Sequence, residues 1–226
     1  MGELRLYAIS IDQARDMVGA VPQEAERLRA VAREGFRVEP PRPAPRGLLA
    51  KLGPLLRHPP DAPVLPHGHP LPSDVDALLA GRYVQPERLR PAWRVVEAWL
   101  AHDGRGHLVL PTSRAVFEQT EFELARAGLS SDFALGRLML GDPRIGLRPV
   151  PGMRVGYAKN RQVLATSRAL AQVLPQVQPT TRERLEPLAD FLASCETWSR
   201  PERPDESGRQ SAPDLVAVLD ESDQPA

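Results

Sequence analysis

A concentration of cationic side chains lies between residues 137 and 168, where seven basic residues face the single acid Asp142. Arginine can pair with a phosphate or carboxylate through two parallel hydrogen bonds. Within this segment the stretch GYAKN at 156–160 precedes an expected helix, whose free amides could also meet an anion. We therefore predict a site for an anionic ligand or partner, although a plain turn with a helix cap is the simpler alternative. The candidate contacts are Arg144, Arg148, Arg154, Tyr157, Lys159 and Arg161.

Histidines form the second group that could do chemistry. His67 and His69 make an H-x-H pair, and His102, Asp103 and His107 make a cluster further along the chain. Neutral imidazoles and a carboxylate are ligands that zinc accepts. However, the first pair stands between prolines, and the two groups lack a recognised zinc spacing. We interpret the histidines as exposed, solvated side chains, and we predict no metal and no cofactor.

Other catalytic patterns are weak. Cys195 is the one cysteine, which excludes an internal disulfide, and it stands on the apolar stripe of an expected helix, as core residues do. Glu118 and Glu121 share a helix face, with Glu123 nearby, but no E-x-x-H accompanies them, so a solvated acidic face is the better interpretation. The sequence carries no G-x-S-x-G, S-x-x-K or phosphate-loop motif. These patterns predict no catalytic residue and leave enzymatic activity undecided, leaning against it.

The charge is unevenly distributed. The 29 basic and 29 acidic residues balance, but the tail from 199 to 226 has seven acids against three arginines. Such an asymmetry is informative about partners. We predict that the basic segment meets an acidic protein surface or this tail, which could screen it until a partner displaces it. Nucleic acid is a weaker alternative because only Tyr157 offers a ring for stacking among these cations.

Periodicity predicts a mostly helical α+β fold with a small sheet. Residues 3–9 alternate as a strand does, and the apolar run at 107–110 favours a second strand. The stretch 144–160 has the glycines and prolines of irregular or strand-turn structure. Helical spacing and caps predict helices near 10–19, 22–35, 73–81, 86–102, 112–128, 130–139, 161–174 and 180–196. Expected N-terminal caps are a Ser73–Asp76 capping box, Thr112 or Ser113, and Asn160. The last helix is expected to begin at Thr180, or near Glu186 with Pro187 in its first turn.

Two segments lack these patterns. Residues 38–72 contain eleven of the 25 prolines and read as a linker or long surface loop. Residues 199–226 are charged and rich in proline and serine, so we predict a disordered acidic tail, whose apolar LVAVL at 215–219 could dock somewhere. The expected organisation is one α+β domain over 1–198, interrupted by the proline-rich loop and followed by the tail.

The order of features resembles an uncharacterised actinobacterial family of small, apparently cytoplasmic proteins that is known as a domain of unknown function. The resemblance is carried by LYAISIDQARDMVGA, FELARAGLSSDFALGRLMLGD and PVPGMRVGYAKNRQVLATSRALAQVL, over roughly 1–37 and 73–198. The resemblance implies an α+β fold, and it adds no information about activity. Glu3 and Arg5 stand too early for a secretory signal, and no 18 apolar residues run together, so we expect a cytoplasmic protein without a membrane span.

These observations favour a non-enzymatic protein-interaction or regulatory module, of the adaptor or immunity type, because catalytic signatures are missing and the linear segments suit partner docking. The alternative is a small enzyme or anionic-ligand-binding protein that uses the 144–160 loop with His102 or His107. A nucleic-acid-associated protein that uses residues 137–168 is the second alternative.

Overall fold

The computed structural model describes residues 2–37, 68–200 and 212–221. Four antiparallel strands form one sheet in the order β2-β1-β4-β3. The strands are β1 (Glu3–Ile9), β2 (Gly106–Pro111), β3 (Met153–Ala158) and β4 (Asp214–Asp220). The predicted strands at 3–9 and 107–110 are confirmed, and the glycine-rich stretch before residue 160 supplies β3.

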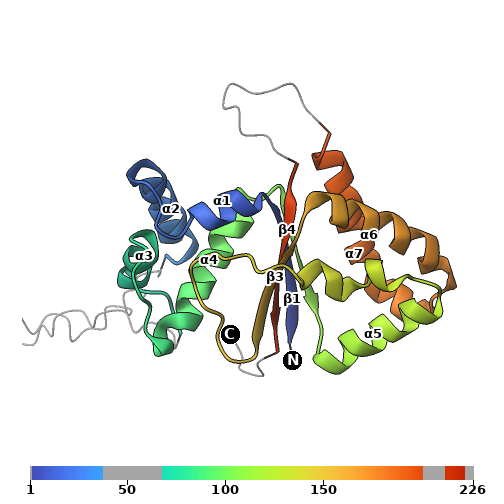
Figure 1. The fold of residues 1–226 in the computed structure, drawn as a ribbon. Coiled ribbons are helices and arrows are strands. Elements are labelled where there is room, and N and C mark those ends of the chain that lie inside the picture. The colour runs from blue at the N-terminus through green and yellow to red at the C-terminus, as the bar shows by residue number, and fades with distance from the viewer. Residues whose placement is uncertain (1, 38–67, 201–211, 222–226) are drawn as a thin grey trace, which may run out of the picture.

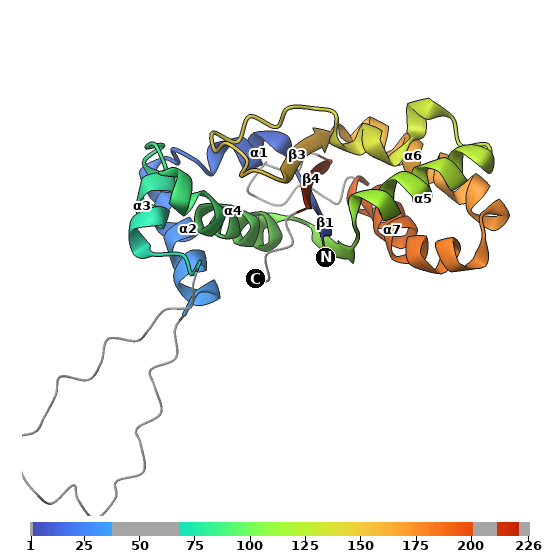
Figure 2. The ribbon, with the colours of Figure 1, turned by 90° about the horizontal axis from the view of Figure 1, so that it is seen from below.

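Helices cover both faces of this sheet. Figure 1 shows one group on the left of the strands and a second group on the right, and Figure 2 shows the strands between the two groups from below. The first group comprises α1 (Ile11–Asp16), α2 (Pro22–Gly35), α3 (Pro72–Leu79), the 3₁₀ turn η3 (Pro86–Arg88) and α4 (Leu89–Asp103). The second group comprises α5 (Arg114–Arg126), η4 (Ser131–Phe133), η5 (Leu135–Met139), α6 (Asn160–Val173), η6 (Leu174–Gln176) and α7 (Pro179–Trp198). The predicted mostly helical α+β fold is confirmed.

The alternation along the strands divides the core into two parts. In β1, Leu4, Leu6 and Ala8 pack with the helices of the second group. Tyr7 and Ile9 pack with those of the first group. Successive strand residues point to opposite faces, so one strand serves both cores.

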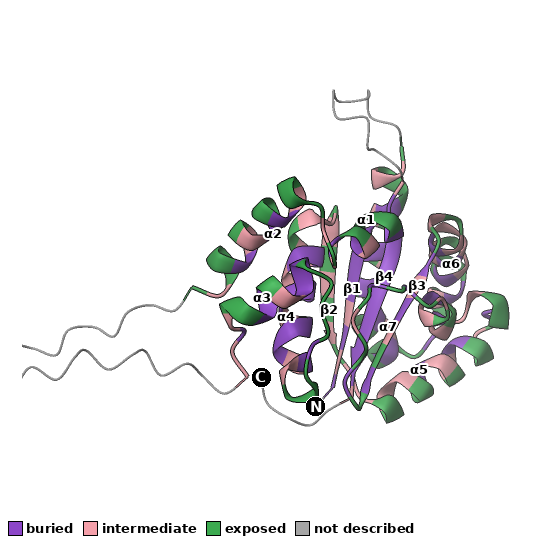
Figure 3. Cartoon of the chain, turned by 60° about the vertical axis from the view of Figure 1, so that its left-hand side comes forward, coloured by how far each residue is buried: buried purple, intermediate pink, exposed green. Residues whose placement is uncertain are grey.

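β4 corrects the predicted disordered tail. Residues 214–220 form a strand that pairs with β1 on one side and β3 on the other, and every residue in it is buried (Figure 3). The prediction was wrong here because the charged, proline-rich surroundings outweighed a five-residue apolar run. Such a run is what a strand covered on both faces requires. Residues 201–211 and 222–226 lie outside the described residues.

Several predicted helix ends are also corrected. Ser113 caps α5 as predicted, with Oγ accepting from Val116 N at 3.3 Å. At α3 the carboxylate of Asp74, instead of the predicted Ser73–Asp76 pair, accepts from Leu71 N at 2.7 Å. α7 starts at Pro179 and continues through Pro187, which lies on the exposed face. A proline at 187 leaves the Glu183 carbonyl without a helical donor, and both residues are exposed.

The proline-rich insert falls mostly outside the described residues, which include only 68–72 of it. Pro72 already belongs to the first turn of α3. Within the described part of the chain, no helix combines the length and the apolar character needed to cross a membrane.

Candidate functional site

Most of the six predicted contacts of the basic segment make local interactions with different neighbours. Arg148 donates to the Tyr83 hydroxyl at 2.8 Å and lies over its ring, and Arg154 pairs with Glu221 at 3.1 Å. Arg144 lies 3.8 Å from Asp142, and Arg161 is exposed on α6. The positive excess counted along the sequence is thus largely matched in space by neighbouring acids.

Tyr157 and Lys159 do lie at a helix N-terminus, but a carboxylate of the chain occupies the anion position. Asp214 accepts from Asn160 N at 2.9 Å and from Lys159 Nζ at 3.1 Å. Ile11 N also donates to Asp214, at 3.2 Å, and shares the acceptor oxygen Oδ2 with Lys159. Asp214 is 6% exposed, so the start of α6 is neutralised internally. Asn160 does not cap the helix as predicted, because its side-chain amide donates to Ser199 Oγ and Pro213 O.

The Gly-Tyr pair before α6 has a packing role. A Cβ added at Gly156 would lie 2.0 Å from the carbonyl oxygen of Met139, so only glycine lets η5 approach β3 this closely. Tyr157 N donates to Gly141 O at 3.0 Å and extends this contact. The close packing of η5 against β3 therefore accounts for the Gly-Tyr motif, and no ligand is needed to explain it.

The histidines do not assemble a metal centre. His69 lies 3.2 Å from Phe36 O through Nε2, and His107 stacks on Tyr7 with the ring centroids 6.4 Å apart. His102 binds Asp103 instead, and His67 lies outside the described residues. No group of three or more metal-ligating side chains occurs among the residues that the structure describes.

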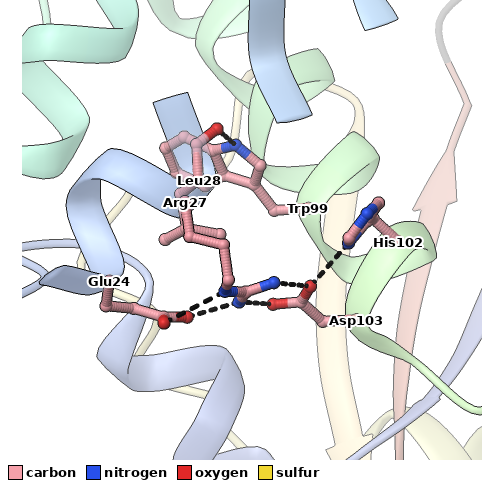
Figure 4. A network of polar contacts seen from close by, with 6 residues as sticks. All are labelled: Glu24, Arg27, Leu28, Trp99, His102 and Asp103. Carbon is pink, nitrogen blue, oxygen red and sulfur yellow. Dashed lines mark hydrogen bonds and ion pairs between the residues drawn. The ribbon is translucent and has the colours of Figure 1, made fainter. Parts of the chain in front are cut away.

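Asp103 has a structural partner that the sequence did not indicate. Its carboxylate accepts from both terminal nitrogens of Arg27, from Nη1 at 2.6 Å, and contacts His102 Nδ1 at 2.8 Å (Figure 4). Burial acts to raise the pKa of Asp103, but the hydrogen bonds from Arg27 and His102 lower it below its ordinary value. Arg27 also binds Glu24, and Trp99 Nε1 donates to Leu28 O at 2.8 Å. This network joins α2 to the end of α4.

A cleft of about 580 Å³ lies elsewhere, between α4 and the β1–β2 pair. Its α4 wall includes residues spaced by three or four, which share one face of the helix. The opposite wall consists of strand residues that point to the α4 side. The lining includes Arg90, Arg94, Glu97, Ala98 and Ala101 from α4, Arg5 and Tyr7 from β1, and His107 and Val109 from β2.

Buried charges line this cleft. Arg5 Nη1 donates to both carboxylate oxygens of Glu97, at 2.9 and 2.8 Å, while its Nη2 donates to Glu3 at 2.7 Å. Glu97 is 9% exposed. Burial raises the pKa of Glu97 above its ordinary value despite the opposing charge of Arg5. Burial and the charge of Glu97 raise the pKa of Tyr7 as well, so its hydroxyl keeps its proton at neutral pH.

Two further arginines reach the cleft. Arg90 pairs with the buried Asp220 of β4 at 2.7 Å. Within the part of the chain that the structure describes, Arg94 donates only a long hydrogen bond, at 3.4 Å, to the carbonyl of Gly68. No carboxylate lies within ion-pair distance of Arg94 in residues 2–37, 68–200 and 212–221. Arg94 is therefore a half-buried cation with hydrogen-bonding capacity left.

Among the predicted residues that the structure describes, only His107 belongs to this cleft. Of the cleft residues that the sequence analysis missed, Arg5 could have been noticed. It is a charged residue between apolar neighbours in a strand, which is typical of a buried functional arginine. Glu97 carried no such signal, because Arg5, which donates to its carboxylate, lies 92 positions away in the sequence. A contact between residues so far apart in the sequence leaves no local sequence pattern.

The chain matches the model of one protein family, described as Domain of unknown function (DUF7691), over residues 1–216. The matched range includes the whole of the first three strands and the first part of β4. No curated protein and no solved structure matches the chain. The resemblance seen in the sequence is confirmed as far as an uncharacterised family, and an actinobacterial origin stays a prediction.

Proposed function

Since the chain belongs to this family of unknown function, we propose its function from the geometry of the site: it binds a small molecule, without catalysis, in the cleft between α4 and the β1–β2 pair. One observation supports this proposal above the others. The cleft is lined by the ion pair between the partly buried Arg5 and the buried Glu97. Burying two charges costs desolvation energy, and an apolar pair of similar volume would stabilise a fold at least as well. Buried ionised groups beside a cavity are typical of binding sites.

The dimensions of the cleft fit this function. Small-molecule sites are concave, have volumes of roughly 300–1,000 Å³, and combine apolar walls with few polar groups. Here Ala98, Ala101 and Val109 provide apolar walls, and the arginines and Glu97 provide the polar groups. Small side chains on α4 leave the space open.

The proposal keeps the non-enzymatic character that the sequence favoured. The one thiol, Cys195, is buried in α7, and burial raises its pKa to about 12, so it stays protonated at neutral pH. His102 is held by Asp103 at 2.8 Å, in the contact network that joins α2 to α4. These observations support binding without a covalent step.

Protein interaction, which the sequence favoured, is the second candidate function. Contiguous apolar patches mark partner surfaces, whereas scattered ones are ordinary. The exposed large apolar side chains of the described residues come from five separate segments: Val21, Tyr83, Val109, Phe122 and Leu140. An adaptor role, an acidic partner and a cytoplasmic location stay predictions from the sequence.

Nucleic-acid binding has less support. Five of the seven cations between 137 and 168 lie within 4 Å of a carboxylate: Arg137, Arg144, Arg154, Lys159 and Arg168. Phosphate contacts need cations that can exchange counterions for the nucleic acid, and neighbouring carboxylates compete for them.

The proposal is tested by filling the cleft. A fragment library is screened against the full chain by ligand-observed NMR, and the hits are titrated against two variants. Ala98→Phe places a ring in the cleft, and Ala171→Phe places the same ring on the exposed face of α6. We expect Ala98→Phe to weaken binding at least about tenfold, which is about 1.4 kcal/mol, and Ala171→Phe to leave it unchanged. Hits that bind both variants equally, or a library without hits, would contradict the proposal.

A further inference from the structure

We infer that the cleft takes an aromatic carboxylate, an inference that rests on the proposed function. The ligand is a monoanion whose carboxylate pairs with Arg94. Its ring lies beside Ala98, Ala101 and the Tyr7–His107 pair. Each part of this inference rests on a different feature of the lining.

Arg94 provides the anion contact. Arg5 and Arg90, the other arginines of the cleft, already hold the carboxylates Glu97 and Asp220 at 2.8 and 2.7 Å. Among the described residues, Arg94 has only the 3.4 Å contact to the Gly68 carbonyl, and its guanidinium is always charged. A ligand carboxylate would give it two short, parallel hydrogen bonds.

The charges of the lining argue against a dianion. Three arginines, Arg5, Arg90 and Arg94, face three acids, Glu87, Glu97 and Asp220. Glu3 adds a further negative charge next to Arg5. A phosphate dianion would be repelled by these carboxylates and would find one available cation, whereas a single negative charge is matched by Arg94.

The part of the cleft beyond Arg94 favours a flat ring. Ala98 and Ala101 lie one and two turns further along α4, about 6 and 10 Å from Arg94 at 1.5 Å per residue. Their small methyl groups line the cleft together with Tyr7 and His107, whose rings are inclined by 23°. His107 is exposed, so one face of its ring is available for an offset-stacked aromatic group.

The experiment compares three probes that share a phenyl ring. They are 3-phenylpropionate, its neutral isostere 3-phenylpropanamide, and the dianion phenyl phosphate, titrated into the full chain by NMR. We expect the acid to bind at least about tenfold more tightly than the amide and more tightly than the phosphate. In Arg94→Gln this advantage should disappear while the affinity for the amide stays the same. Arg184→Gln, an exposed arginine on α7, is the matched control and should change neither.

The outcomes separate this inference from the proposed function. Equal binding of acid and amide, a preference for the phosphate, or an advantage that survives in Arg94→Gln overturns the ligand class, although fragments that Ala98→Phe excludes would still support the cleft. If no probe and no fragment responds to Ala98→Phe, both proposals fail. Arg94→Lys, which keeps the charge but loses the planar pair of donors, is expected to retain part of the advantage.

Discussion

The two faces of the sheet are built from the same strands but differ in chemistry. Towards α5–α7, β1 and β4 present only apolar side chains, among them Leu4, Leu6 and Leu219, in a continuous core. Towards α1–α4, the same strands present Arg5 and Asp220 beside Tyr7 and Val218. One face therefore stabilises the fold, and the other combines stabilisation with a polar cleft. Functional residues are to be sought where the alternation of side chains along a strand places charges in the interior.

Removing β4 is expected to give the largest effect, because this strand completes both faces. A chain that ends at Ser211 loses the ladders to β1 and β3 and the carboxylates of Asp214 and Asp220. We expect loss of the cooperative urea transition and of the near-ultraviolet circular dichroism signal. A shortened chain that unfolds cooperatively at the same urea concentration would show that β4 is dispensable for both cores.

On the apolar face, Leu6→Ala should cost about 3 kcal/mol of unfolding free energy, because Leu6 is 1% exposed and the change leaves a cavity. Leu108 of β2 points to the same face but is only partly buried. Leu108→Ala is the matched control, with an expected loss of about 1 kcal/mol. Urea denaturation measures both, and equal losses would contradict the idea that this core is centred on β1 and β4.

On the polar face, Glu97→Ala should cost about 2 kcal/mol, because Arg5 is left with Glu3 alone in a partly buried position. The double variant Arg5→Met with Glu97→Met should regain most of this loss, since an apolar pair replaces the ion pair. Denaturation curves of the three proteins give the comparison. A double variant as unstable as the single one would indicate that the ion pair stabilises the fold.

The smallest expected effect concerns the Asp103 network between α2 and α4. Because the folded pKa of Asp103 is lowered, its carboxylate stabilises the fold above the unfolded pKa, about 4, and this contribution is lost as the pH falls through the folded value. Asp103→Asn should therefore cost about 1 kcal/mol or less at pH 7, since Arg27 is 43% exposed and water screens the pair.

The difference between the wild type and Asp103→Asn should shrink below pH 4, and thermal unfolding from pH 7 to pH 3 measures it. Asp132→Asn is the control, because that carboxylate is 77% exposed. A difference that is independent of pH would show that Asp103 acts through packing and not through its charge.

Local patterns predicted most helices and the edge strand β2, because helical spacing and alternation act over a few residues. They failed at β4, where the order of Asp214–Asp220 depends on two strands more than 50 residues away in the sequence. They also gave no sign of the burial of Glu97, which pairs with the distant Arg5. The predicted anion site at residues 156–160 has the expected amides and lysine, but Asp214, 54 residues from Asn160, occupies it.

By itself, the sequence determined the fold class, most helix positions, the absence of an internal disulfide and the uneven distribution of charge. These properties follow from composition and from periodicities of two and 3.6 residues. The tertiary structure alone decided which charges are matched, which face of the sheet holds the cleft, and that a C-terminal strand lies in the middle of the sheet. The physical reason is that pairing between strands and between charges depends on distance in space, which local patterns do not encode.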